Sequence, residues 1–403
     1  MTLVECFDSN PIKNILGCLR FNPERLIIIG KEEHIKNPLI THKKILENRG
    51  LTPEIIVYDV DLGDYTDVLN TLTHIVNTEL QCIIDVNGGR ETIFMAVGVL
   101  LGNLTESQKK RVSVQGYNQH KETDIDFDGG RTFTGSRVSL TASEIIALYG
   151  GTIHPTNEHQ FEEYDVDDIE YLWKIVCQDQ NKWNKAISAL NEFECRSVSE
   201  TEVYIPLDTV AHEITGYKEK EALVFDLLTK LENNALIRNR SFGNMLRYDY
   251  VDPFYHYCTR KAGNILELKT LFEARKVTEN GKAYFDDFYM SISIDWDGII
   301  HPSVEMITET RNEIDLFLVH GLTPIFISCK NGVIGEVELY KLNTVASRFG
   351  GTNAKKVLVL TSESYLSEGL ARRAKDMDIY IVKNAAELTA EGWQRAFKKM
   401  VKG

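Results

Sequence analysis

Two oppositely charged residues stand at the open end of a predicted β-hairpin. Asp315 enters an apolar stretch that reaches a tight turn at His320-Gly321, and Lys330 follows the apolar run 325–327. A hairpin places the start of its first strand beside the end of its second. We therefore predict that Asp315 and Lys330 are neighbours, although 14 residues separate them. Exposed ion pairs are common and contribute little, but the flanking apolar runs predict that this pair is partly buried.

Acidic residues on two predicted helices accompany the hairpin. Glu267 lies on a helix predicted from Gly263 to Lys276, and Glu336 and Glu338 lie on a helix predicted from Gly335 to Phe349. Carboxylates and a backbone carbonyl can hold a hard divalent cation through oxygen. Such a cation polarises a phosphoryl oxygen and lowers the pKa of a bound water, and a lysine stabilises the negative charge of the transition state. Residues of these types are suited to hold a divalent cation beside a lysine.

The sequence order of these groups resembles that of the PD-(D/E)xK nucleases, in which an acid on a helix precedes an aspartate on a strand, a lysine on the paired strand and then a helix. The resemblance implies that Glu267 and Asp315 are ligands of Mg²⁺ or Mn²⁺ and that Lys330 is the catalytic lysine. It implies the carbonyl of Cys329 as a further metal ligand.

One position of the predicted catalytic set departs from this pattern. The acid that usually stands two residues before the lysine is replaced by Ser328, whose hydroxyl is a weaker metal ligand than a carboxylate. Glu313, Glu336 or a water would have to substitute, and we expect Mn²⁺ to work better than Mg²⁺. The same departure leaves an alternative open, in which the chain is a ligand-sensing regulator that binds nucleic acid without cutting it.

The first part of the chain alternates short apolar strands with helices over about 110 residues. This alternation predicts a parallel sheet covered by helices, in a doubly wound, Rossmann-like domain. Residues 111–117 and 131–139 are expected to add edge strands around an acidic loop at 124–130. The predicted strands are Thr2–Phe7, Arg25–Gly30, Glu54–Val60 and Cys82–Val86, and the predicted helices are Pro11–Leu19, His42–Asn48, Tyr65–Glu79 and one that ends at Leu101.

Two loops of this domain have the composition of an anion site. Ser9-Asn10-Pro11 follows the first strand, and the segment 87–91, Asn-Gly-Gly-Arg-Glu, follows the fourth. Doubly wound sheets bind ligands at such strand ends, and glycines let backbone N–H groups approach an anion at a helix N-terminus. A tight turn alone would explain the glycines equally well. The chain contains neither a GxGxxG nor a Walker motif, so a nucleotide cofactor and a metabolic Rossmann enzyme are not supported.

These loops on a Rossmann-like domain, joined to a nuclease-like C-terminal part, resemble the CARF-domain CRISPR ancillary nucleases. The resemblance implies an endonuclease, for DNA or RNA, that cyclic oligoadenylate activates in type III CRISPR antiviral defence. It also implies a homodimer that holds one two-fold symmetric messenger, cyclic tetra-adenylate, across its axis. The family's Thr-Gly-Gly type of loop is Asn-Gly-Gly here. The implied messenger-binding residues are Ser9, Asn10, Asn14, Asn87, Gly88, Gly89, Arg90 and Glu91.

A helical connector is predicted between the two α/β parts. A helix over 140–149 ends at Gly150-Gly151, and the polar segment Thr152–Gln160 follows as a linker. The connector is predicted to be a winged-helix-like module, with one helix over Asp168–Phe193, helices over 209–215 and 219–233, and a hairpin over 236–250. Its surroundings are acidic, which argues against sequence-specific DNA binding by this module. The predicted domains are 1–151, a Rossmann-like CARF sensing domain; 152–254, the connector; and 255–403, a restriction-endonuclease-like α/β nuclease domain.

A mixed sheet flanked by helices is expected for the last domain. Residues 295–298, Asp-Trp-Asp-Gly, are expected to form a turn after a strand, and the alternative is that their two aspartates belong to the acidic cluster of the site. The further predicted elements are strands over Tyr284–Ile294, Lys356–Leu360 and Ile379–Val382, a helix over Tyr365–Met377 and an amphipathic helix from Ala385.

The overall composition is that of a cytoplasmic protein. The chain has 403 residues, a net charge of −14 and seven cysteines, none in a Cys-x-x-Cys. An odd number of such cysteines predicts reduced, buried thiols and no zinc site. From Tyr255 onward the chain has 20 basic and 19 acidic residues, so a near-neutral C-terminal domain can still meet nucleic acid. We expect neither a signal peptide nor a membrane span.

Overall fold

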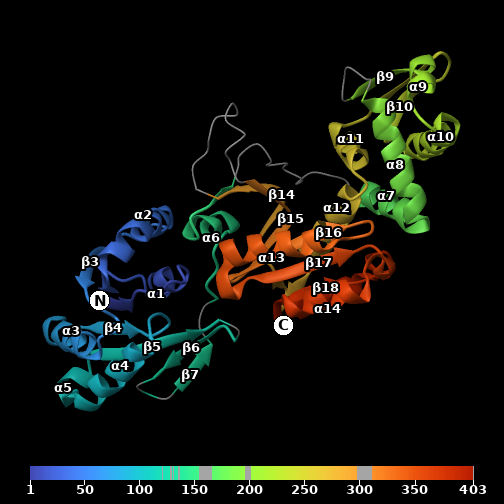
Figure 1. Ribbon diagram of the computed structural model, residues 1–403. Coiled ribbons are helices and arrows are strands. Elements are labelled where there is room, and N and C mark those ends of the chain that lie inside the picture. Colours follow the sequence, from blue (N-terminus) through green and yellow to red (C-terminus); the bar gives the residue numbers. More distant parts are fainter. Residues whose placement is uncertain are drawn as a thin grey trace.

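Two large sheets and one smaller module follow one another along the chain. The computed structural model describes residues 1–119, 121–127, 129, 131–134, 137–153, 166–195, 201–296 and 311–402. The first large sheet, drawn in blue and teal, lies at one end of the molecule, and the small module, drawn in green, lies at the other (Figure 1). The second large sheet, drawn in orange, lies between them and contains the predicted hairpin (Figure 1).

The first sheet has seven strands in the order β3-β2-β1-β4-β5-β6-β7. Strands β1 to β5 pair in parallel, and β6 and β7 are antiparallel at one edge. The strand order reverses between β1 and β4, where doubly wound sheets bind ligands. The elements are β1 (Thr2–Cys6), α1 (Lys13–Phe21), β2 (Arg25–Gly30), α2 (Glu32–Asn48), β3 (Glu54–Asp59), α3 (Tyr65–Thr78), β4 (Cys82–Asp85), α4 (Glu91–Asn103), α5 (Glu106–Lys109), β5 (Val112–Asn118), β6 (Thr123–Asp126) and β7 (Arg131–Thr134).

The second sheet has six strands in the order β18-β17-β16-β15-β14-β8. Strands β14, β15 and β16 are antiparallel, whereas β16, β17 and β18 are parallel. Helices α12 and α15 pack on one face and α13 packs on the other. The elements are α6 (Ala142–Leu148), β8 (Thr152–Ile153), α12 (Asn264–Arg275), β12 (Thr278–Glu279), β13 (Lys282–Ala283), β14 (Asp287–Asp295), β15 (Arg311–His320), β16 (Thr323–Lys330), α13 (Glu336–Gly350), β17 (Lys355–Leu360), α14 (Glu368–Asp376), β18 (Ile379–Val382) and α15 (Ala390–Lys402), with 3-10 turns at Gly351–Asn353, Glu363–Tyr365 and Ala385–Glu387.

The connecting module combines helices with a three-stranded sheet in the order β10-β11-β9. Its buried side chains form one continuous core with α12, α15 and one face of the second sheet, so the module is firmly attached there. The elements are α7 (Val166–Gln178), α8 (Gln180–Glu194), β9 (Glu202–Pro206), α9 (Leu207–Glu213), α10 (Tyr217–Asn233), β10 (Ile237–Ser241), β11 (Met245–Tyr250) and α11 (Pro253–Arg260).

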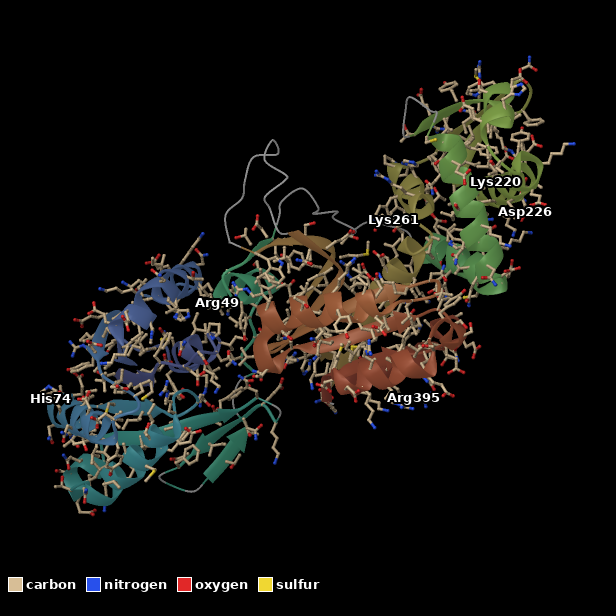
Figure 2. All side chains as sticks on the ribbon, viewed as in Figure 1. Arg49, His74, Lys220, Asp226, Lys261 and Arg395 are labelled. Carbon is tan, nitrogen blue, oxygen red and sulfur yellow. The ribbon has the colours of Figure 1, made fainter. Side chains whose placement is uncertain are left out.

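Helix α6 joins the first sheet to the second. At its start, the Ala142 backbone N–H donates to the Asp287 carboxylate at 2.8 Å. Arg49, at the end of α2, forms a 2.5 Å ion pair with Glu144 in the first turn of α6 (Figure 2). The backbone N–H of Leu140 donates to the carbonyl of Gly321 in the hairpin turn at 3.1 Å. The end of α2 and the hairpin turn are therefore tied to the same short helix.

Several predicted boundaries were wrong. The single helix over 168–193 is two helices, because the Asp179 carboxylate accepts the Lys182 N–H at 2.8 Å and caps a new start. Thr152–Ile153, expected to open a linker, pair with β14. The hairpin turn is Gly321-Leu322, one residue later than predicted. Part of the acidic loop at 124–130 is β6, and α2 begins ten residues before the predicted His42.

Other expectations lie partly outside the described residues. These are the rest of the predicted linker, 154–160, and the second half of the turn at 297–298. Five of the seven cysteines are buried, as predicted; Cys177 is half-buried and Cys195 is exposed. Within the described ranges, no helix is both long enough and apolar enough to span a membrane.

Candidate active site

The β15–β16 hairpin brings Asp315 and Lys330 together, as the sequence predicted. The backbone ladder of the hairpin ends at the pair Leu316↔Ile327. Just beyond that pair, the Lys330 Nζ lies 3.4 Å from the Asp315 Oδ2. The two side chains are 28% and 17% exposed, so this pair is screened less than a surface pair.

Where the backbone pairing of the hairpin ends, the carboxylate of Asp315 accepts hydrogen bonds from the end of β16. Its Oδ2 accepts hydrogen bonds from the Cys329 backbone N–H at 2.7 Å and from the Ser328 hydroxyl at 3.1 Å, besides its contact with Lys330. Among the described residues, none donates to the Asp315 Oδ1. One oxygen therefore fixes the carboxylate over the end of β16, while the other is open to a further partner.

The neighbouring strand β14 is irregular at the same level. Ser291 has a left-handed φ of +50°, and the β14–β15 ladder skips Ser291 and Asp315. A left-handed conformation costs a residue with a Cβ about 1–2 kcal/mol, and such strain is concentrated at functional sites. The Ser291 hydroxyl donates to the Glu267 Oε2 at 3.3 Å. Both ladders of β15 are thus interrupted at Asp315, where an acid from α12 approaches.

Glu267 lies in the first turn of α12 with a strongly perturbed carboxyl group. The pKa of Glu267 is raised to about 8, first by burial and then by the negative charges of Asp315 and Glu313, against the lowering effects of Lys261 and Lys330. Lys261, labelled in Figure 2, also lies 3.6 Å from the Glu313 carboxylate. An acid whose ionised form is this unfavourable gains from a nearby cation.

A cavity of about 280 Å³ opens beside Lys330 on the α13 side of the sheet. Besides Asp315, the Lys330 Nζ lies 3.4 Å from the Glu338 Oε2 in the first turn of α13. Burial opposes the charge of Lys330, but Asp315 and Glu338 outweigh it and raise the pKa of the ammonium, which stays charged. Lys341 adds a second cation to the cavity wall. The lining residues are Asn312, Glu313, Ile314, Asp315, Phe326, Ile327, Ser328, Lys330, Glu338, Lys341, Leu342 and Val345.

The chemistry of these donors can be tested against a divalent cation. Among the residues that the structure describes, no three His, Cys, Asp or Glu side chains form a group that could hold a metal ion. Glu267 contacts Ser291 and does not line the cavity, and Asp315 and Glu338 share the Lys330 ammonium. Carboxylate, hydroxyl and carbonyl oxygens nevertheless form the donor set that Mg²⁺ and Mn²⁺ prefer. The donor types therefore suit such an ion, and two of the acids, Asp315 and Glu338, already share one positive charge.

A second cavity, of about 480 Å³, lies at the carboxyl ends of the strands in the first sheet and is called the first-sheet cavity below. Three of the residues predicted to bind a ligand, Ser9, Gly89 and Arg90, line it. Lys31 and Arg90 are the N-cap residues of α2 and α4, so two helix N-termini and two cations meet there. Such an arrangement favours an anion. The other lining residues are Phe7, Asp8, His34, Asp61 and Leu62.

Four other predicted residues build the two loops beside this cavity. The Asn14 side chain holds the backbone of Asp8 with two hydrogen bonds of 2.7 Å. The backbone N–H of Gly89, which the sequence offered to a bound anion, donates to the Asp8 Oδ2 at 3.0 Å. A Cβ at Gly88 would lie 2.8 Å from a backbone carbonyl, so only glycine fits. The Asn87 amide is held at 2.5 Å by an oxygen of the Asp85 carboxylate, and Asn10 accepts a 3.3 Å hydrogen bond from the Tyr149 hydroxyl. The last predicted residue, Glu91, is exposed in the first turn of α4.

Sequence reasoning missed residues that tertiary contacts bring into the two cavities. Asp8 had a signal, because it directly precedes the predicted loop at Ser9. Lys341 had one too, because residues three apart on a helix share a face and Glu338 precedes it by three. Lys31 had none, because it follows a strand that carried no ligand-binding motif.

The fold defined by these parts is a Rossmann-like α/β domain followed by a restriction-endonuclease-like α/β domain. No family model and no curated protein sequence matches the chain. Can2 from Sulfobacillus thermosulfidooxidans, solved in complex with cyclic tetra-adenylate, is 16% identical with a TM-score of 0.67, over 100% of this chain and 97% of that chain. Protein VC1899 from Vibrio cholerae is 13% identical with a TM-score of 0.73, over 100% of this chain and 97% of that chain.

A third solved structure matches less completely. A type III CRISPR defence DNA nuclease activated by cyclic oligoadenylate is 11% identical with a TM-score of 0.51, over 90% of this chain but 45% of that chain. Likeness at these identities describes the fold. The predicted fold class and the resemblance to CARF-domain CRISPR nucleases are confirmed at that level.

Proposed function

We propose that this chain is a divalent-metal-dependent endonuclease that cyclic tetra-adenylate switches on in type III CRISPR antiviral defence. The observation that carries the proposal is the cavity at the end of the β15–β16 hairpin, where Asp315 and Lys330 meet 3.4 Å apart. The fold adds support, because Can2, solved with cyclic tetra-adenylate, matches the whole chain. A homodimer in the cytoplasm is the form in which we expect the protein to act.

The reaction that this cavity suits is hydrolysis of a phosphodiester bond. A water oxygen bonds to phosphorus and gives up a proton to solvent, the bond to the leaving oxygen breaks, and that oxygen takes up a proton from solvent. Negative charge increases on the phosphoryl oxygens in the transition state. Lys330, kept charged by Asp315 and Glu338, would stabilise that charge, and Lys341 would orient an adjacent phosphate. Mg²⁺ or Mn²⁺, held by Asp315, Glu267 and the carbonyl of Cys329, would supply a Lewis acid and an activated water.

The second cavity suits the activator. Lys31 and Arg90 bring positive charge to two helix N-termini, which suits the phosphates of a cyclic oligonucleotide. One cavity of about 480 Å³ would hold half of a tetra-adenylate ring, and the second chain of a dimer would hold the other half. The messenger can activate the enzyme only by binding the active arrangement more tightly than the resting one.

The test is cleavage of plasmid DNA, single-stranded DNA and RNA by the full-length protein, with and without cyclic tetra-adenylate, in Mg²⁺ and in Mn²⁺. We expect messenger-dependent cleavage that Asp315→Ala and Lys330→Ala each reduce at least about a hundredfold, since each removes a transition-state interaction. Both variants should still bind the messenger.

Two observations support a second candidate function, nucleic-acid binding without cleavage. Position 328 is a serine where the nuclease pattern has an acid, and the described residues contain no group of three His, Cys, Asp or Glu side chains that could hold a metal ion. A protein that shifts nucleic acid on a gel but leaves it intact, in either metal and with messenger, would be a ligand-sensing binder. Wild-type cleavage by Lys330→Ala would contradict the proposed site.

A further inference from the structure

The catalytic cavity lacks an acid on β16. Ser328 stands two residues before Lys330 on the same face of the strand, and its hydroxyl donates to the Asp315 Oδ2 at 3.1 Å. A neutral hydroxyl cannot balance the charge of a divalent cation as a carboxylate does. A site built only from Asp315 and Glu267 would therefore bind such an ion weakly.

Glu338 brings a second carboxylate to the Lys330 ammonium. Helix α13 starts at Glu336, and Glu338 in its first turn contacts Lys330, the last residue of β16. The Glu338 Oε2 and the Asp315 Oδ2 lie at the same distance, 3.4 Å, from the Lys330 Nζ. Both acids also line the same cavity as Ser328. The two carboxylates already share one cation, the ammonium group.

The two acids that the sequence offered as substitutes are less well placed. Glu336 forms an ion pair with Arg373 and does not line the cavity. Glu313 lines the cavity, but its side chain is 54% exposed and lies 3.6 Å from Lys261. The Glu338 side chain is 32% exposed, and its described ion pair is the one with Lys330.

We infer that Glu338 supplies the metal-binding carboxylate that Ser328 lacks, so that the acid of this site has moved from the strand to the first turn of α13. The inference rests on the proposed function and adds a residue to it. It explains how a nuclease site can keep Asp315 and Lys330 while it has no acid on β16. It also predicts that an acid restored at position 328 and an acid at 338 can replace one another.

The test measures Mn²⁺ binding directly, so it does not depend on cleavage. Mn²⁺ is titrated into the full-length protein and followed by calorimetry and by the loss of the free-ion signal in electron paramagnetic resonance. We expect Glu338→Gln to weaken Mn²⁺ binding about 10- to 100-fold, because removal of even an outer partner of a metal has an effect of that size. The double variant Ser328→Glu with Glu338→Gln should recover most of that affinity.

Matched controls separate Glu338 from its neighbours. Glu336→Gln removes a carboxylate from the same helical turn and should bind Mn²⁺ like the wild type. Melting temperatures of all variants check that each is folded. Nuclease activity with messenger should follow Mn²⁺ affinity across the series.

Three outcomes overturn the inference. If Glu338→Gln binds Mn²⁺ as tightly as the wild type, Glu338 is not a metal ligand. If Glu313→Gln loses Mn²⁺ affinity instead, the role belongs to Glu313. If Ser328→Glu does not restore Mn²⁺ affinity to Glu338→Gln, an acid at position 328 cannot replace the acid at position 338. If the wild type itself neither binds Mn²⁺ nor cleaves, the proposed function fails as well; if it does both and Glu338→Gln is unaffected, only this inference fails.

Discussion

A carboxyl group whose pKa is raised to about 8 in the folded chain makes the stability of the fold depend on pH. Glu267 is in that position because of burial and the neighbouring Asp315. In the unfolded chain a glutamate ionises near pH 4.3. Between that pH and about 8 the unfolded chain has already released the proton that the folded chain retains, so stability falls as pH rises. Below this window both states are protonated and the effect vanishes.

Replacement of Glu267 by glutamine removes this titration. In metal-free buffer we expect Glu267→Gln to match the wild type below about pH 4 and to exceed it by about 2 kcal/mol or more in unfolding free energy at pH 8. Urea unfolding at half-unit pH steps measures the difference. Glu336→Gln, on the exposed side of α13, should run parallel to the wild type. Parallel curves for Glu267→Gln would mean that its carboxyl titrates normally.

At the residue scale, the sequence predicted contacts that lie within one supersecondary motif. Asp315 and Lys330 meet because hairpin geometry is local and the register follows from the turn. The interruption of the strand pairing at Ser291 could not be predicted from the sequence, because a left-handed conformation is typical of glycine and not of serine. The partner of Lys330 on α13 depends on how that helix packs on the sheet, which no spacing specifies.

At the scale of elements, the end of α6 contacts a loop of the first sheet and the C-terminal end of α13. The Tyr149 hydroxyl, just after α6, donates to the Asn10 Oδ1 at 3.3 Å, beside the loop that lines the first-sheet cavity. The same hydroxyl lies 2.7 Å from where a Cβ of Gly351 would be, at the end of α13. Burial and the charge of Asp8 raise the pKa of Tyr149 to about 12, so it stays a neutral donor. Glu338 and Lys341 of helix α13 line the cavity beside Lys330.

We predict that Tyr149 helps to couple messenger binding to cleavage. Tyr149→Phe keeps the ring and removes one hydrogen bond, which contributes about 1 kcal/mol, or roughly fivefold in an equilibrium. The concentration of cyclic tetra-adenylate that gives half-maximal cleavage should rise about fivefold, while Mn²⁺ affinity stays unchanged. Tyr171→Phe, which removes a hydroxyl bonded to a backbone carbonyl in the connector, is the matched control. An unaltered activation curve for Tyr149→Phe would exclude this contact from the coupling.

The elements themselves were largely predictable, and their junctions were not. The apolar runs of β1, β2 and β4 and the turn glycines defined the first sheet, because parallel strands are buried on both faces. The pairing of β8 with β14 was not predictable, because two residues carry no periodicity. Asp252 and Pro253 did contain the signal for α11, an N-cap followed by proline at the first helical position, which the prediction overlooked.

At the scale of the whole molecule, the first-sheet cavity predicts the stoichiometry of activation. Each chain of 45.9 kDa offers one such cavity, with Lys31 and Arg90 as its cations. A cyclic tetra-adenylate has two-fold symmetry, so two identical chains related by a two-fold axis can each bind an equivalent half. We therefore expect one messenger for every two chains and a particle of about twice the chain mass.

Titration calorimetry with cyclic tetra-adenylate should give a molar ratio near one half, and light scattering should give the dimer mass with and without messenger. Arg90→Ala should weaken binding at least about tenfold, because two copies of a phosphate-facing cation are lost at once and each charge-assisted contact contributes about 1.5–3 kcal/mol. The ratio itself should stay near one half, since symmetry sets it. Lys261→Ala, at a residue that lies away from the blue and teal first sheet in Figure 2, should leave messenger affinity unchanged. A monomer that binds one messenger per chain would show that a single cavity holds the entire ring, and the two-fold arrangement would have to be abandoned.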